Sequence, residues 1–251
     1  MQDLLEKYDI PAPRYTSYPT VPYWEADQLS ATDWMAHVTG AFKKDNRLSL
    51  YIHLPFCEKL CTYCGCNKHI TRNHAVESPY IQAVLGEWKL YLDQLPGRPV
   101  LSELHLGGGT PTFFHPENLR LLLEAIFETV DIAPDREFSF EAHPASTSRE
   151  HLAVLYDLGF RRISIGVQDV DEKILRIINR FQTIEEVRFV TETAREIGYE
   201  SVNFDLVYGL PLQKQEHVKK TVELVSELMP DRIAFYSYAH VPWLKNGQRA
   251  F

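Results

Sequence analysis

From Leu48 onward, strand-like and helix-like segments alternate along the chain, and this alternation restricts the possible folds more than any other feature. Six segments are predicted as strands from their short apolar or alternating patterns: Leu48–Leu54, Leu101–Leu106, Glu137–Ala142, Arg162–Gln168, Val202–Val207 and Arg232–Tyr238. Helical patterns separate them, which favours a parallel sheet with right-handed crossovers. The sequence therefore predicts an α/β fold, and both a doubly wound sheet and a barrel remain open.

Residues that favour helix starts lie in the connecting segments. Ser78-Pro79 is placed as the N-cap and first residue of one helix. Thr147 with Glu150, and Thr183 with Glu186, match the capping-box pattern. These positions predict where three of the helices begin.

Residues 1–47 form a separate N-terminal part, rich in proline and tyrosine. The prolines between positions 11 and 22 argue against a continuous helix there. A short helix is predicted over Thr32–Lys44, with Trp34 and Phe42 on its apolar face.

The charge balance and the start of the chain exclude several classes of protein. The 251 residues carry 26 Lys+Arg and 34 Asp+Glu, a formal net charge of −8, which argues against a non-specific nucleic-acid binder. No apolar run reaches the roughly 18 residues that a membrane span needs. Met1–Glu6 lacks the basic and apolar regions of a signal peptide. We expect a cytoplasmic monomer that binds neither nucleic acid nor membrane.

All four cysteines lie between positions 57 and 66, in the pattern C-x3-C-x2-C-x-C. Small secreted proteins spread disulfides through a short chain, whereas crowded thiols in a large chain without an export signal indicate metal ligands or redox groups. Four thiolates can complete a tetrahedral zinc site, but zinc motifs usually separate their ligands into two distant pairs. The spacing favours an iron–sulfur cluster over zinc.

Ligands bind at the carboxyl ends of the strands in parallel α/β folds, and every predicted strand here ends in glycines or polar residues. The features expected to meet at that edge are the cysteine loop 57–66, Gly107-Gly108-Gly109-Thr110-Pro111, Glu141, Gln168-Asp169, Asp205 and Tyr238-Ala239-His240. Their convergence is stronger evidence for a site than any one member.

Each member also has a purely structural explanation. The three glycines fit a tight turn as well as a close approach of backbone to a ligand. Glu141 and Asp205, taken singly, fit solvated turn residues. Tyr51 fits a buried structural side chain as well as an inward-facing one, and the stretch from Lys68 to His74 fits a solvated basic segment. His53 and His105 are expected to make satisfied hydrogen bonds in the core, and His143 and His240 are weaker ligand candidates than the thiols.

Several strings of residues resemble a known family. Cys57-x3-Cys61-x2-Cys64, after a strand and followed by Gly107–Pro111, resembles the signature of the radical S-adenosylmethionine (SAM) enzymes. Three further segments narrow the resemblance to the oxygen-independent coproporphyrinogen III oxidase family: Tyr51–Cys57, Cys64–Lys68 and Arg14–Thr20. The resemblance extends over essentially the whole chain.

For the fold, the resemblance implies a partial (β/α)6 barrel over residues 48–251, with residues 1–47 as an N-terminal extension over the active site. The family also has a C-terminal region that helps to cover the site. Because that region does not follow here, we expect a truncated chain that encloses its substrate incompletely.

The resemblance also implies a role for each site residue. Cys57, Cys61 and Cys64 would hold a 4Fe–4S cluster with its fourth iron open to SAM, and Cys66 would lie beside the active site as the candidate catalytic residue. Tyr51, Gly108 and Glu141 would bind this first SAM. A second SAM would be surrounded by Tyr63, Gly109, Thr110, Gln168, Arg180, Asp205 and Ala239.

The reaction implied by the resemblance is oxidative decarboxylation of two propionates of coproporphyrinogen III to vinyl groups, which gives protoporphyrinogen IX. The cofactors would carry the radical chemistry, with a one-electron donor and an electron acceptor as further partners. Arg14 is a candidate contact for a substrate carboxylate.

Three alternatives remain. A haem chaperone of the same superfamily can keep the cluster motif, but Cys66 and the Arg14–Pro19 segment favour the enzyme. A radical SAM methyltransferase or haem-degrading enzyme would share the barrel. A structural zinc module would leave the strand-end residues as turn stabilisers.

Overall fold

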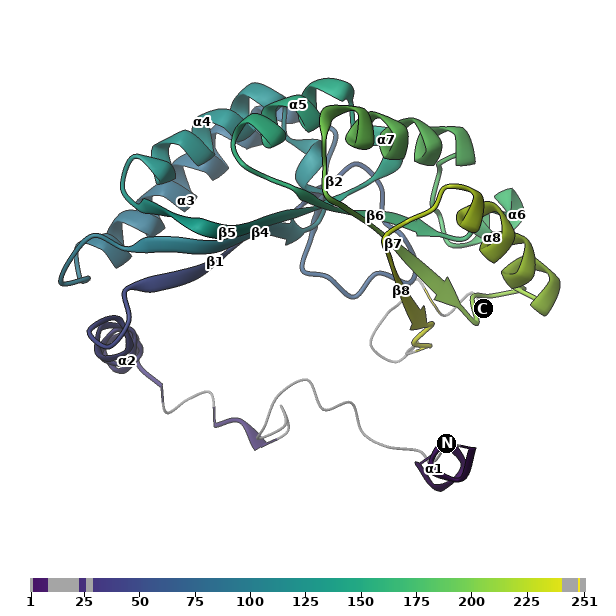
Figure 1. Ribbon diagram of the computed structural model, residues 1–251, viewed down its shortest axis with the longest axis horizontal. Helices are drawn as coiled ribbons and strands as arrows, with labels where there is room; N and C mark the ends of the chain where they lie inside the picture. The colour runs from purple at the N-terminus through teal and green to yellow at the C-terminus, as the bar shows by residue number, and fades with distance from the viewer. Residues whose placement is uncertain (1, 9–22, 26–28, 241–247, 249–251) are drawn as a thin grey trace.

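The computed structural model describes residues 2–8, 23–25, 29–240 and 248. Its centre is a parallel sheet in the order β1-β4-β5-β6-β7-β8 (Figure 1). The strands are β1 (Arg47–Leu54), β4 (Val100–Gly108), β5 (Asp131–Ala142), β6 (Arg162–Gln168), β7 (Ser201–Tyr208) and β8 (Arg232–Ser237). Each strand pairs with the one before it in this series, so the strand order never reverses. The sheet is therefore a partial barrel, and the doubly wound alternative is excluded.

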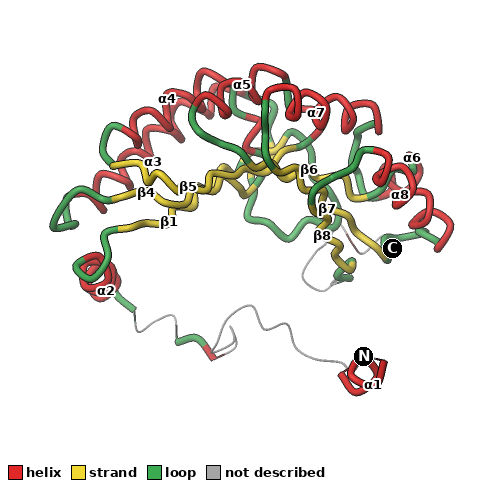
Figure 2. The backbone as a smooth tube through the Cα atoms, viewed as in Figure 1, coloured by secondary structure: helices red, strands yellow, loops and turns green. Residues whose placement is uncertain are grey.

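Helices cover one side of this sheet, as Figures 1 and 2 show. They are α3 (Glu77–Leu92), α4 (Pro116–Phe127), α5 (Arg149–Asp157), α6 (Glu172–Ile177), α7 (Ile184–Ile197) and α8 (Gln215–Glu227). Short elements connect them: strands β2 (Phe56–Cys57) and β3 (His69–Ile70), and 3-10 turns η3 (His74–Val76), η4 (Pro111–Phe113) and η5 (Pro144–Ser146).

Alternation along the strands sorts side chains between the two faces of the sheet. Ile163, Ile165 and Val167 of β6 are at most 2% exposed and belong to the main hydrophobic core beneath the helices. Full burial of each such side chain contributes about 1.5–3 kcal/mol. Ser164 of the same strand and Asp205 of β7 line a cavity on the opposite face. Apolar packing on one face thus leaves the other face free to present polar groups.

One of the predicted capping boxes is confirmed. The Thr183 hydroxyl accepts a hydrogen bond from the Glu186 backbone N–H at 3.1 Å, and the Glu186 carboxylate accepts one from the Thr183 N–H at 2.8 Å. This pair fixes the start of α7, and Gly198, in the left-handed conformation with φ +114°, ends the helix.

The other two helix starts were predicted at the wrong residues. Helix α3 begins at Glu77, not at Ser78-Pro79, because η3 runs directly into it and Asn73 caps that earlier turn. The capping box of α5 consists of Ser148 and His151, not Thr147 and Glu150. Thr147 is only 5% exposed and donates its hydroxyl hydrogen bond to His143 O at 2.8 Å instead.

The described part of the N-terminal region contains two helices, α1 (Gln2–Tyr8) and α2 (Ala31–Phe42). Helix α2 confirms the predicted short helix, and the Trp34 indole donates to the Tyr91 hydroxyl of α3 at 3.3 Å. Helix α1 was not predicted. The Arg14–Thr20 segment, including the candidate substrate contact Arg14, lies outside the described residues. None of the described helices has the length and apolar character required to cross a membrane.

Candidate functional site

A cavity of about 950 Å³ lies at the carboxyl ends of the strands. All but one of the predicted site residues line it: Cys57, Cys61, Tyr63, Cys64, Cys66, Gly108, Gly109, Thr110, Glu141, Gln168, Arg180, Asp205 and Ala239. The exception is Tyr51, whose ring stacks on the cavity-lining His105 with centroids 5.9 Å apart. The predicted convergence of strand ends is therefore confirmed, except that Gly107, Asp169 and His240 do not line the cavity.

The cysteine loop is held in place at its ends and along its length. At its ends, β2 and β3 pair in parallel, with Phe56 opposite His69 and Cys57 opposite Ile70. Along the loop, the Asn179 amide donates to Leu60 O at 2.7 Å, across 119 positions of sequence. These contacts tie the loop to the segment after α6.

The donor set of the loop fits an iron–sulfur cluster. All four thiols are free of disulfides, and those of Cys57, Cys61 and Cys64 are half-buried. A single tetrahedral ion with metal–sulfur bonds of about 2.3 Å holds its sulfurs roughly 4 Å apart. Within the described residues, these three sulfurs do not all lie within 4.8 Å of one another. Three thiolates spread around a shared space fit a larger cluster with one iron left open.

The local environment raises the pKa of two of the thiols. Burial raises the pKa of Cys57, and the Thr110 hydroxyl, 3.4 Å from its sulfur, opposes this only in part. A hydrogen bond with Cys64, together with burial, raises the pKa of Cys66. Without metal these thiols keep their protons at neutral pH, so metal binding has to displace the proton of any thiol that becomes a ligand.

Arg180 places a buried positive charge beside the loop. Its guanidinium donates to Gln182 Oε1 at 2.7 Å, to the Tyr63 hydroxyl at 3.2 Å and to the carbonyl of Gly166, and one nitrogen lies 3.8 Å from Cys61 Sγ. A fixed cation at this point stabilises negative charge on the sulfur. Protein groups therefore already engage the guanidinium of Arg180, which the resemblance places beside a second SAM.

Glu141 and Tyr51 lie together at the ends of the first strands. Glu141 accepts from the Gly108 N–H at 3.3 Å and lies 3.6 Å from His105 Nε2. Tyr51 is 54% exposed, so the interpretation of a buried structural tyrosine is wrong. Burial of its hydroxyl and the Glu141 charge raise its pKa, which keeps it neutral. The pair presents an aromatic face and a carboxylate.

The histidines differ in their surroundings. His53 and His105 make the expected hydrogen bonds, to Tyr51 and Ser139, but on the open face of the sheet and not in the core. His143 lines the cavity, and burial lowers its pKa so that it stays neutral. His240 does not belong to the cavity lining.

Gly108 and Gly109 are required for close packing between the end of β4 and the segment that leads into the cysteine loop. A Cβ at Gly109 would lie 2.5 Å from the Pro55 carbonyl group, and one at Gly108 would lie 2.7 Å from the His53 ring. The Gly109 N–H also donates to Leu54 O at 2.9 Å. The missing side chains allow the strand end to lie directly against the start of the loop.

Asp205 and Gln168 reach the cavity from β7 and β6. Asp205 accepts from Ser164 at 2.8 Å and from Asn203 at 3.0 Å, yet burial raises its pKa. Gln168 has φ +67°, an uncommon conformation for a residue with a side chain. Asp169, expected at the same edge, turns away and accepts hydrogen bonds from Gln213 and Thr221.

Some residues that border the cavity were not predicted, and the surroundings of one were predicted wrongly. Lys59, Phe181 and Tyr236 line it, although no local pattern in the sequence marks them. His74 was expected in a solvated basic segment, but its Nδ1 lies 2.6 Å from the buried carboxylate of Glu77. His115 meets the same carboxylate, and its separation of 38 positions explains why no short-range pattern revealed the group.

Comparisons with known proteins agree with this geometry. Residues 51–225 match the family described as the radical SAM superfamily. The oxygen-independent coproporphyrinogen III oxidase of Pseudomonas aeruginosa is 38% identical over 242 residues, covering 96% of this chain and 52% of that enzyme. The enzyme of the same name from Escherichia coli K12 is 39% identical over 246 residues, with coverages of 98% and 53%. The chain thus spans about half the length of these curated relatives.

Solved structures show the same relationship. The coproporphyrinogen III oxidase of Escherichia coli, described as a radical SAM enzyme, matches with a TM-score of 0.88 and 38% identity over 98% of this chain and 54% of that one. A radical SAM methyltransferase from Kitasatospora setae, with cobalamin and a [4Fe-4S] cluster bound, matches with a TM-score of 0.51 and 15% identity over 75% of this chain and 34% of that one. The second match is a likeness of fold alone.

Proposed function

Because this chain belongs to the radical SAM superfamily, we propose that it binds a 4Fe–4S cluster and SAM and decarboxylates coproporphyrinogen III oxidatively to protoporphyrinogen IX. One observation carries the proposal: Cys57, Cys61 and Cys64 of the loop share a cavity with the polar groups of every later strand end. The curated relatives named above carry that activity in their names.

Cys57, Cys61 and Cys64 are the proposed ligands of the cluster, and Cys66 stands beside them. When bound, the cluster and SAM supply one-electron chemistry at an unactivated C–H bond. The buried guanidinium of Arg180, 3.8 Å from Cys61 Sγ, stabilises the negative charge that the thiolate ligand brings into the site.

The remaining groups would bind and orient SAM. The exposed ring of Tyr51 suits a sulfonium cation, and Glu141 beside it suits an ammonium group as an acceptor. Gly108 completes this set through its backbone. For a second SAM, Asp205 offers a carboxylate to a ribose hydroxyl or an amino group. The other proposed contacts are Tyr63, Gly109, Thr110, Gln168, Arg180 and Ala239.

The substrate and partners complete the proposal. Residues 1–47 would extend over the active site, with Arg14 as a contact for a propionate, because a tetra-anionic substrate needs local cations. A one-electron donor and an electron acceptor are required by the stoichiometry of oxidative decarboxylation. We place the chain in the cytoplasm as a monomer that binds neither nucleic acid nor membrane.

Cluster binding is tested by anaerobic reconstitution of the chain with iron and sulfide. We expect a thiolate-to-iron charge-transfer absorption and close to four irons per chain. Cys57→Ala, Cys61→Ala and Cys64→Ala should each abolish this absorption, whereas the matched control Cys66→Ala should retain it. Tight zinc binding at these thiols without iron uptake would overturn the assignment.

Activity is tested with the reconstituted chain, a reductant, SAM and coproporphyrinogen III. Formation of 5′-deoxyadenosine together with divinyl product, detected by mass spectrometry, is the expected result. SAM cleavage without decarboxylation would assign a different radical SAM reaction. Haem binding without SAM cleavage would instead favour the chaperone.

A further inference from the structure

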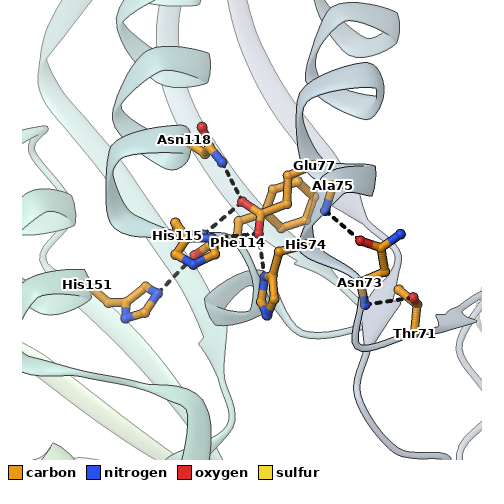
Figure 3. A network of polar contacts seen from close by, with 9 residues as sticks. All are labelled: Thr71, Asn73, His74, Ala75, Glu77, Phe114, His115, Asn118 and His151. Carbon is orange, nitrogen blue, oxygen red and sulfur yellow. Dashed lines mark hydrogen bonds and ion pairs between the residues drawn. The ribbon is translucent and has the colours of Figure 1, made fainter.

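A second group of ligand-type side chains, drawn in Figure 3, lies outside the proposed SAM and cluster residues. Its two histidines line the cavity, and its glutamate does not. The group consists of His74 in η3, Glu77 at the start of α3 and His115 just before α4. One ligand atom of each lies within 4.8 Å of the others. Three donors from three separate elements therefore point at one place.

Both imidazoles address the same oxygen of Glu77. Nδ1 of His74 lies 2.6 Å from Oε1, and Nδ1 of His115 lies 2.8 Å from it. The two nitrogens thus converge on one carboxylate oxygen, and the three atoms lie within 4.8 Å of one another. This combination of two imidazoles and one carboxylate is one of the usual donor sets of zinc when a fourth position stays open.

The other carboxylate oxygen is held separately. Oε2 accepts from the His115 backbone N–H at 2.9 Å and from the Asn118 amide at 2.7 Å, as Figure 3 shows. These two bonds fix the plane of the carboxylate and direct Oε1 toward the imidazoles. Outer hydrogen bonds of this kind orient the ligating groups of metal sites.

The carboxylate of the group is buried and its two imidazoles are partly exposed, as an open metal site requires. The Glu77 side chain is 0% exposed, whereas the side chains of His74 and His115 are 39% and 55% exposed. The His74 ring stacks on Phe113, with centroids 4.4 Å apart. The carboxylate is therefore rigid, one imidazole is held in orientation, and a cation can reach the group from the cavity side.

We propose that His74, Glu77 and His115 form a binding site for a divalent transition-metal ion, with Zn²⁺ as the best match. The ligands are Nδ1 of each histidine and Oε1 of Glu77, and the fourth position is left to water. Without metal, the two Nδ1–H groups donate to the carboxylate, so binding through Nδ1 requires each neutral imidazole to carry its proton on Nε2 instead. The ion would join the segment after the cysteine loop to the start of α4. This proposal is independent of the substrate of the enzyme.

The test is zinc binding to the cluster-loaded chain, in which the three loop thiols are occupied. Competition with a chromophoric chelator gives the affinity for Zn²⁺, and metal analysis gives zinc separately from iron. We expect one zinc per wild-type chain and a loss of more than about tenfold in zinc affinity for His115→Ala. Removing a residue that only hydrogen-bonds to a metal ligand already weakens metal binding by about 10–100-fold, and His115 is a proposed ligand itself. Asn118→Ala should weaken binding by about 10–100-fold through the orientation of Glu77.

The matched control is His69→Ala, an exposed histidine in the same segment that lies outside the group. It should bind zinc as tightly as the wild type. His115 is tested in place of Glu77 because a half-exposed imidazole can be removed without leaving a cavity in the core, and circular dichroism verifies the fold. Equal zinc affinity of His115→Ala and wild type, or no zinc retained at a stoichiometric concentration, would overturn the proposal.

Discussion

Gly109 and Gly86 are residues of the same type in opposite surroundings. A Cβ at Gly109 would meet the Pro55 carbonyl at 2.5 Å, whereas one at Gly86, inside α3, would find nothing within 4 Å. Gly109→Ala should therefore destabilise the chain by about 1–3 kcal/mol through overpacking. Gly86→Ala should stabilise it by about 0.5–1 kcal/mol, because alanine loses less conformational entropy in a helix. Urea unfolding of both variants gives these differences, and equal midpoints would contradict the packing explanation.

Asp205 predicts a pH-dependent stability difference. Its pKa is raised by burial above the ordinary value of 3.8, so its ionisation opposes folding. This cost is fully present above the raised pKa and disappears as the pH falls through it. The melting temperature of Asp205→Asn minus that of wild type should therefore be larger at pH 7 than at pH 4. Thermal scans of the metal-free chain measure this difference.

The control for Asp205 is Glu223→Gln, an exposed carboxylate in α8. Its melting temperature relative to wild type should change little between the two pH values. A larger change for Glu223→Gln than for Asp205→Asn would refute the burial argument.

At the residue scale, the sequence predicted which residues belong to the site better than it predicted the contacts between them. The site residues that follow strands could be predicted because strand ends are recognisable from local patterns, whereas Tyr63 and Arg180 were named only through the family resemblance. The partners of Arg180 could not be predicted, since its contacts with Tyr63 and Cys61 join positions 117 and 119 apart. The His74–Glu77–His115 group was missed for the same reason.

The start of α7 depends on a side-chain cap. Thr183→Ala removes the bond to the Glu186 N–H and should cost about 0.5–2 kcal/mol. Ser78→Ala is the matched control, because Ser78 lies inside the first turn of α3 and makes no cap. Chemical unfolding compares the two variants. A loss for Ser78→Ala as large as that for Thr183→Ala would show that the cap is not the cause.

The predicted elements agree with the structure in type and differ mainly at their starts. Strand β6 spans the predicted residues, and β5 begins at Asp131, earlier than the predicted Glu137. The predicted start of α5 was wrong because a tertiary contact overrides the local pattern. Thr147 has the right chemistry for a cap but is drawn into a buried hydrogen bond with Thr112. Such competition depends on packing, which local sequence does not contain.

Over the whole molecule, helices bury one face of the sheet but leave its last strand less covered. Ile165 of β6 is 0% exposed, whereas Ile233 of β8 is 48% exposed. Ile165→Ala should therefore cost about 2–5 kcal/mol, and Ile233→Ala much less. Urea unfolding of the two variants, analysed with one common m-value, measures both losses of stability. Similar losses would mean that a covering layer protects β8 as it protects β6.

The parallel α/β class was predictable from the alternation of strands and helices, but the choice between barrel and doubly wound sheet was not. That choice depends on whether each new strand is added at the same edge of the sheet as the strand before it. No local sequence pattern indicates the edge. The resemblance supplied it, and the in-order pairing of β1 to β8 confirms it.

This in-order pairing has a consequence for how the chain acquires its cofactor. Each strand can dock onto its predecessor, so pairing within the sheet joins residues 23 to 54 positions apart. The cysteine loop is the exception: its anchors at Ile178 and Asn179 follow it by more than a hundred positions, and such a closure carries a larger entropic cost. The loop that appears early in synthesis therefore reaches its final shape late. Iron delivered before β6 and α6 are in place would meet unorganised thiols.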